Sequence, residues 1–129
     1  VDWLKDMPLL QEKTSVTLGS LMPGGRMDVD VNDPGVQNAV NFAVVQHNRG
    51  TNDMYLHQAA EVVKAQRQVV AGMKYIITVK MAKTNCRKDR PNEVCAIHEN
   101  PENAQPYQCE FTVWSRPWEN FLQLVETKC

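Results

Sequence analysis

One segment of the chain carries a clear helical pattern of apolar residues. Asn32, Asp33 and Pro34 are typical of a helix start, because Asn or Asp caps the first free N–H groups and Pro fits the first turn. Apolar residues then recur every three or four positions, at Val36, Ala39, Val40, Ala43 and Val44. We predict a helix from Pro34 to Arg49, ended by Gly50. Its single apolar stripe must pack against another layer, which the rest of the chain has to supply.

Strands are predicted on both sides of this helix, from apolar residues that alternate with polar ones. The alternation is clearest between Met73 and Met81 and weak between Tyr55 and Val70. The predicted strands are Met27–Val31, Tyr55–Val70, Met73–Met81, Cys109–Val113 and Phe121–Val125. The short link Val70–Ala71–Gly72 favours antiparallel neighbours, and the polar segment 85–105 is expected to be irregular. We therefore predict an α+β fold, with one long helix laid across a five-stranded antiparallel sheet.

The length and charge of the chain argue against some classes of protein. The chain has 129 residues, the size of one domain, and a formal net charge of −1, which gives no reason to expect binding to nucleic acid or to an anionic membrane. It lacks a run of about eighteen apolar residues that could cross a bilayer. Residues 1–21 are expected to form a mobile arm before a single domain at 22–129. Charged residues interrupt the arm, so we do not expect a signal peptide there; a secreted protein would already have lost its signal.

All four cysteines lie in the last third of the chain. An even number favours two disulfides and an oxidising compartment. Of the three pairings that four cysteines allow, we favour Cys86–Cys95, which would close a polar loop, and Cys109–Cys129, which would join the last two strands. Zinc is the alternative, because Cys95 and His98 have a plausible ligand spacing, but a structural zinc site usually needs a second close pair.

The chain shows no arrangement typical of an active site. With all cysteines in disulfides, no catalytic thiol remains, so we predict that the protein is not an enzyme and that it holds no cofactor or metal. The histidines are expected to be ordinary surface or half-buried residues: His47, His57 and His98.

Three unusual loop features fall at positions that an antiparallel sheet brings to one edge. In the link Gln68–Gly72, Val69 and Val70 stand where a hairpin tip usually carries Asn, Asp, Gly or Ser. Gly24–Gly25 precedes the first strand, and Pro117–Trp118 joins the last two. Since alternate connections of an antiparallel sheet emerge at the same end, these features would form one wedge with apolar tips. Such a patch usually marks a binding site; taken singly, each feature could instead be a linker, a buried corner or a core tryptophan.

These residues resemble the pattern of the cystatins, specifically the secreted type with two disulfides. The family pattern has a glycine near the N-terminus, a Gln-x-Val-x-Gly loop and a Pro-Trp pair near the C-terminus, and the four cysteines here fall in the family's order. The resemblance covers Met22–Cys129 and implies a five-stranded antiparallel sheet wrapped around one helix. It also implies a secreted protein that reversibly and tightly inhibits papain-like cysteine proteases such as the cathepsins. The implied protease-binding residues are Met22, Pro23, Gly24, Gln68, Val69, Val70, Ala71, Gly72, Pro117 and Trp118.

The resemblance also implies how such an inhibitor would act. Residues just before Gly24 would occupy the non-primed subsites of the protease and the other two loops its primed side, so that the catalytic thiol is covered but not acylated. Pro23 departs from the aliphatic residue that commonly precedes this glycine. The alternative is a cystatin-like domain used for another task, such as a cathelicidin-type pro-region or a signalling carrier, which would lack the two loop motifs found here.

Two further expectations concern a second partner and the oligomeric state. Family members that also inhibit legumain have Asn-Asp in the loop after the helix, where this chain has Asn52 and Asp53; the alternative is an ordinary turn. We expect a monomer, with a domain-swapped dimer as the alternative. A tip made of Val69 and Val70 would be strained, and straightening it would let two chains exchange their helical halves, with loss of the wedge.

Overall fold

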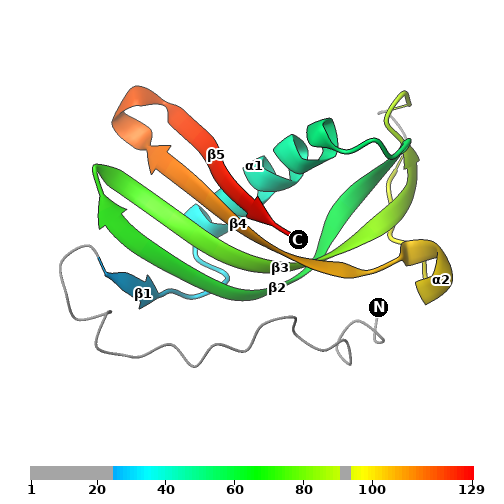
Figure 1. The fold of residues 1–129 in the computed structure, drawn as a ribbon, viewed down its shortest axis with the longest axis horizontal. Helices are drawn as coiled ribbons and strands as arrows, with labels where there is room; N and C mark the ends of the chain where they lie inside the picture. Colours follow the sequence, from blue (N-terminus) through cyan, green and yellow to red (C-terminus); the bar gives the residue numbers. More distant parts are fainter. Residues whose placement is uncertain (1–24, 91–93) are drawn as a thin grey trace.

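The structure, a computed structural model, describes residues 25–90 and 94–129. As predicted, one long helix lies across one face of a five-stranded antiparallel sheet (Figure 1). The strands occur in the sheet in chain order, β1-β2-β3-β4-β5. Their bounds are β1 Arg26–Asp28, β2 Tyr55–Val70, β3 Gly72–Arg87, β4 Tyr107–Arg116 and β5 Phe121–Lys128. The helices are α1 Pro34–Gly50, the short α2 Pro101–Ala104 and the 3-10 turn η3 Pro117–Glu119. The arm at 1–21 and the candidate residues Met22, Pro23 and Gly24 lie outside the described residues.

The start of α1 is fixed by Asp33. Its carboxylate accepts hydrogen bonds from the backbone N–H groups of Gly35 at 2.9 Å and Val36 at 3.4 Å, which have no acceptor within the helix. Pro34 takes the first position, where a missing N–H costs nothing. At the other end the helix includes Gly50, just beyond the predicted Arg49, and Thr51 follows in an extended conformation. The helix expected from the sequence is therefore confirmed apart from its last residue.

The apolar stripe of α1 packs on the sheet and forms the core. The buried residues of this cluster are Val36, Ala39, Val40, Ala43, Ala65, Ile77, Val79, Met81, Cys109, Phe111 and Val113. Burial of each large apolar side chain contributes about 1.5–3 kcal/mol, so the contact between helix and sheet stabilises the fold. Within the described residues, no helix is both long enough and apolar enough to cross a membrane.

Irregularities in the pairing of β2 with β3 curve the sheet around α1. The register shifts at three places, between Tyr55 and His57, Ala59 and Glu61, and Val62 and Lys64. A bulge of this kind bends the strand and increases its twist. The long, curved pair of strands in Figure 1 is the result.

The strand ends differ from the predicted bounds where polar contacts decide them. β1 stops at Asp28 rather than Val31, because a turn follows in which Asp30 accepts hydrogen bonds from the backbone of Asn32 and Asp33. β3 continues past the predicted Met81 to Arg87, because its polar end still pairs with the start of β2. β4 and β5 are likewise longer than predicted.

In the segment predicted to be irregular, 85–105, the described residues include the end of β3 up to Arg87 and the short helix α2. α2 begins after Asn100, whose side chain accepts a hydrogen bond from the N–H of Glu102 at 2.9 Å. The Asn-Pro pair at its start is a helix-start signal of the kind that marks α1. The prediction of an entirely irregular segment was wrong at this point.

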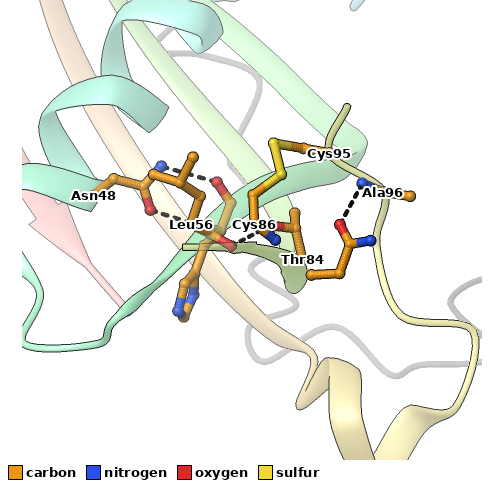
Figure 2. The surroundings of a disulfide bond; sticks show 8 residues. Asn48, Leu56, Thr84, Cys86, Cys95 and Ala96 are labelled. Carbon is orange, nitrogen blue, oxygen red and sulfur yellow. Dashed lines mark hydrogen bonds between the residues drawn. A yellow bond between two sulfur atoms is a disulfide. The ribbon is translucent and has the colours of Figure 1, made fainter. Parts of the chain in front are cut away.

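Both predicted disulfides are present, Cys86–Cys95 and Cys109–Cys129, and no cysteine of the described residues is free. Figure 2 shows the first of them, which ties the end of β3 to the segment that follows it. Beside it, Asn85 and Ala96 exchange two hydrogen bonds of 3.1 Å each. The polar loop is thus held against the sheet, and the sulfur of Cys95 that the zinc alternative required is used in the disulfide.

Candidate functional site

Three segments far apart in the sequence meet at one end of the sheet (Figure 1). β2 and β3 pair up to Val70 and Gly72, so their turn lies at this end. β4 pairs with β3 up to Ser115 and then enters the β4–β5 connection. β1 joins them because its first residue pairs with Gln68. The start of β1, the β2–β3 turn and the β4–β5 connection therefore lie at the same end of the strands, as the chain order of the antiparallel strands requires. We call the surface formed by these three segments the apolar edge, or simply the edge.

The β2–β3 turn is tighter than predicted. The ladder extends to the pair of Val70 and Gly72, which leaves Ala71 at the tip, where Val69 and Val70 had been expected. The left-handed conformation that the turn needs falls on Gly72, with φ of 97°, and glycine adopts it without steric cost. Neither valine has a positive φ, so the strain expected at the valines is absent from this turn. Val69 keeps an exposed side chain, 56% of its surface.

The β4–β5 connection presents a tryptophan to solvent. Pro117 begins the short turn η3, and Asn120 closes it in the left-handed region with φ of 49°. The N–H of Asn120 donates to the carbonyl of Pro117 at 3.1 Å. Trp118 lies on the outside of this turn and is 67% exposed, so it is not a core residue. With Val69, it gives the edge two apolar side chains that a partner can cover.

A second loop lies at the opposite end of β2, between α1 and the start of that strand. Asn52 is exposed there, and Asp53 points back into the protein. The carboxylate of Asp53 accepts hydrogen bonds from the N–H of Tyr55 at 3.0 Å and from His57 Nε2 at 2.8 Å. Its Oδ2 also lies 3.2 Å from Lys83 Nζ. The loop is therefore anchored on one side of Asn52.

The histidines of α1 and β2 meet beside this loop, which the sequence did not predict. The hydroxyl of Tyr107 lies 2.8 Å from His47 Nε2 and 2.6 Å from His57 Nδ1. The ionised carboxylate of Asp53 can only accept, so His57 Nε2 carries a proton. When His57 is neutral, its Nδ1 then accepts from Tyr107, and the Tyr107 oxygen accepts from His47 Nε2. One consistent chain of hydrogen bonds thus runs from α1 through β4 and β2 to the Asn52 loop.

The titration of this cluster follows from its surroundings. Desolvation opposes the charge of Asp53, but the hydrogen bonds from Tyr55, His57 and Lys83 outweigh it and lower the pKa of Asp53 to about 2. Burial raises the pKa of Tyr107 to about 12, with a smaller contribution from the Asp53 charge. Burial also lowers the pKa of His47, and the nearby His57 and Lys88 add to this effect. The folded protein therefore favours ionised Asp53 beside neutral His47 and Tyr107.

Stability is expected to decrease in two steps as the pH falls. The pKa of His47 is below its ordinary 6.5 in the folded protein, so the unfolded chain binds this proton first and stability falls as the pH drops through 6.5. The lowered pKa of Asp53 also stabilises the folded protein. This stabilisation is fully present above pH 3.8 and is lost as the pH falls towards 2. Urea unfolding between pH 7 and pH 5 should show a smaller loss for His47→Gln than for the wild type. The control His98→Gln should lose as much stability as the wild type. If the free energy of unfolding of His47→Gln decreased with pH as steeply as that of the wild type, His47 would not be the cause.

The same histidine also lies close to sulfur, without forming a metal site. A ring nitrogen of His47 and the sulfur atoms of Cys109 and Cys129 lie within 4.8 Å of one another. The two sulfurs are bonded to each other as a disulfide, and a metal ligand would have to be a thiolate. The cluster therefore offers one histidine nitrogen and no thiolate.

Comparison with known proteins is consistent with the sequence resemblance. The model of the Cystatin domain family matches residues 24–118. Cystatin-C from Paralichthys olivaceus is 60% identical over 123 residues, which cover 95% of this chain and 95% of that protein. Cystatin from Oncorhynchus keta is 48% identical over 129 residues, 100% of this chain and 98% of that protein. The crystal structure of dimeric human cystatin F matches with a TM-score of 0.76 and 29% sequence identity, over 95% of each chain.

The family match extends from Gly24 to Trp118 and includes α1, the four strands β1 to β4 and the β2–β3 turn. The fold agrees with that of the solved cystatin structure. The chain belongs to the cystatin family, whose members are known as inhibitors of cysteine proteases rather than as enzymes.

Proposed function

We propose that this protein is a reversible, tight-binding inhibitor of papain-like cysteine proteases, including cathepsins. The observation that carries the proposal is the edge at which the start of β1, the β2–β3 turn and the β4–β5 connection meet, with Val69 and Trp118 exposed. The residues Met22, Pro23 and Gly24 precede β1 and complete this edge in the proposal. Together these segments would fill the cleft of the protease on both sides of its catalytic thiol.

In the proposed inhibition the protein occupies the protease cleft by non-covalent contact and does not react with the catalytic thiol. Ala71 forms a narrow tip, and the ladder that ends at Val70 and Gly72 keeps the tip in one shape. A turn that is ordered before binding loses little conformational entropy when it enters a cleft. Trp118 and Val69 provide the apolar contact. The bound inhibitor is expected to stay uncleaved, since the turn enters the cleft as a closed hairpin rather than as an extended substrate.

Titration of papain tests the proposal directly. The intact protein, separated by size exclusion so that monomer and any dimer are assayed apart, should inhibit papain with nanomolar or tighter affinity and one inhibitor per active site. The monomer should carry this activity, and mass spectrometry should find the inhibitor uncut after dissociation. Trypsin, a serine protease, is the control and should be unaffected. Micromolar inhibition of papain would overturn the proposal, and a fully active dimer would overturn the expectation that exchange of the helical halves destroys the binding edge.

We further propose that the protein is secreted and acts mainly as a monomer. Its two disulfides suit an oxidising compartment. A dimer formed by exchange of the helical halves would open the β2–β3 turn, and dimeric human cystatin F, a solved relative, makes a dimer a relevant alternative. The size-exclusion step of the papain titration distinguishes these states.

A second candidate function is inhibition of legumain through the loop that carries Asn52. The observation that favours it is an exposed asparagine beside an anchored residue: Asp53 is held by Tyr55, His57 and Lys83. An asparagine held in this way would enter the specificity pocket of a protease that cuts after asparagine.

Replacement of Asn52 by alanine should abolish legumain inhibition and leave papain inhibition unchanged, because the loop and the apolar edge lie at opposite ends of β2. Inhibition constants for both proteases provide the measurement. Asn103→Ala, an exposed asparagine of α2, is the matched control and should change neither constant. Intact legumain inhibition in Asn52→Ala would exclude this second site.

A further inference from the structure

The β2–β3 turn is held by a side chain that belongs neither to this turn nor to the β4–β5 connection. Trp114 of β4 donates a hydrogen bond from its indole Nε1 to the backbone carbonyl of Ala71, with an N···O distance of 2.8 Å. Ala71 has no opposite residue in the ladder between β2 and β3. The bond therefore ties the tip of the turn to a different strand.

An edge-to-face contact with a second ring and a guanidinium group fix the orientation of this indole. Trp114 meets Phe121 edge to face, with the ring centroids 5.5 Å apart. The guanidinium carbon of Arg116 lies 4.5 Å from the centroid of the Trp114 ring and 4.1 Å from that of Phe121. Contacts between a guanidinium group and aromatic faces are attractive. The donor of Trp114 is therefore aimed at Ala71 before any partner arrives.

The same arginine connects this cluster to the β4–β5 connection. Arg116 Nε lies 3.3 Å from Glu119 Oε2, and Glu119 follows the exposed Trp118 directly. Gly72 allows the two turns to approach, because a Cβ at this position would lie 2.8 Å from Arg116 Cγ and would clash with the carbonyl of Ser115. The two turns are thus linked by Trp114, through Ala71, and by Arg116, which lies beside Gly72 and Glu119.

We propose that Trp114 is a positioning residue of the protease-binding edge: its bond to Ala71 holds the β2–β3 turn in place relative to Trp118. The inference rests on the proposed inhibition of papain-like proteases. Two turns that enter one cleft must fit at the same time, and a fixed spacing removes the entropy cost of ordering them on binding. Trp114 acts through Ala71 and needs no contact with the protease itself.

Trp114→Phe tests this role, because it keeps an aromatic ring for Arg116 and Phe121 and removes the N–H donor together with the five-membered ring of the indole. Loss of one hydrogen bond of ordinary strength should weaken papain binding about fivefold to tenfold, through faster dissociation rather than slower association. In the free inhibitor, the amides of Ala71, Gly72 and Met73 should exchange with solvent faster than in the wild type. The midpoint of thermal unfolding should change little, since the bond lies at the end of the sheet.

Thr112→Val is the matched control, since it removes a donor from a neighbouring position of β4 without touching the turn. It should leave both amide exchange at the turn and dissociation unchanged. Unaltered amide exchange or an unaltered dissociation rate in Trp114→Phe would overturn the positioning role. If Trp114→Phe fails to fold, NMR of the wild type decides: the indole N–H of Trp114 should exchange slowly and that of Trp118 fast, and fast exchange at both would overturn the proposal. A wild type that does not inhibit papain would refute the proposed function, while amide exchange would still report on the turn.

Discussion

Replacement of Gly72 by alanine is expected to lower the free energy of unfolding by about 2–4 kcal/mol and to weaken papain binding. An L-residue at positive φ costs about 1–2 kcal/mol, and φ of 97° at this position lies beyond the region that such residues tolerate. The added Cβ would also clash with the backbone carbonyl of Ser115, which cannot rotate away as a side chain could. To relieve both effects, the turn would have to open, and the bond between Ala71 and Trp114 would lengthen or break.

Urea unfolding and papain inhibition measured on the same preparation test this prediction. Gly50→Ala is the matched control, because a Cβ there meets nothing within 4 Å and no positive φ is required. The control should unfold within about 0.5 kcal/mol of the wild type and bind papain normally. A Gly72→Ala variant as stable and as inhibitory as the control would show that the turn does not depend on glycine.

Trp118→Ala is expected to leave stability nearly unchanged and to reduce affinity for papain strongly. The side chain is 67% exposed in the free protein, so its removal creates no cavity. An exposed tryptophan that becomes covered at the centre of an interface typically contributes about 2 kcal/mol or more, which corresponds to roughly a thirtyfold weaker complex. Most of this loss should appear as faster dissociation.

Stopped-flow association and dissociation rates with papain measure the effect. Val94→Ala is a suitable control, because Val94 is 92% exposed and belongs to neither turn; its affinity should match that of the wild type. Equal affinities for Trp118→Ala and Val94→Ala would remove Trp118 from the binding edge. Unchanged thermal unfolding in both variants would assign any difference to binding rather than to folding.

The sequence predicts the helix and the layer arrangement well, because both depend on local signals. Asp33 and Pro34 mark the start of α1, and its apolar spacing identifies the buried face. The pattern in β2 is weaker, since register shifts move side chains from one face to the other within a single strand. The end of β3 keeps the alternation in burial, with Ala82, Thr84 and Cys86 buried, but its small and polar residues give only a weak local signal that the strand continues to Arg87. Its position depends on a partner strand that a local pattern does not reveal.

In the candidate site too, the residues with an unusual local signal could be predicted and those placed by distant strands could not. Val69 and Trp118 are recognisable because apolar residues in turns are unusual, and their shared edge follows from the strand order. Trp114 lies just beyond the predicted strand Cys109–Val113 and carries no local signal of its contact with Ala71, which depends on the register between β3 and β4. His47 carried one usable signal, since it continues the spacing of the apolar stripe of α1 and therefore had to face the sheet. Nothing local indicated that it would meet a tyrosine sixty positions later along the chain.

The order of the strands has a consequence for how the protein reaches this fold. The β2–β3 and β4–β5 pairs are joined by short turns, so each can form as a hairpin before the longer connections, through α1 and through residues 88–106, bring the sheet together. Short loops close at a low entropy cost and favour rapid folding. The cysteines of each pair are only 9 and 20 residues apart, and one pair spans the β4–β5 hairpin. Each disulfide can therefore form as soon as its own part of the sheet has assembled, which limits mispairing during oxidative folding.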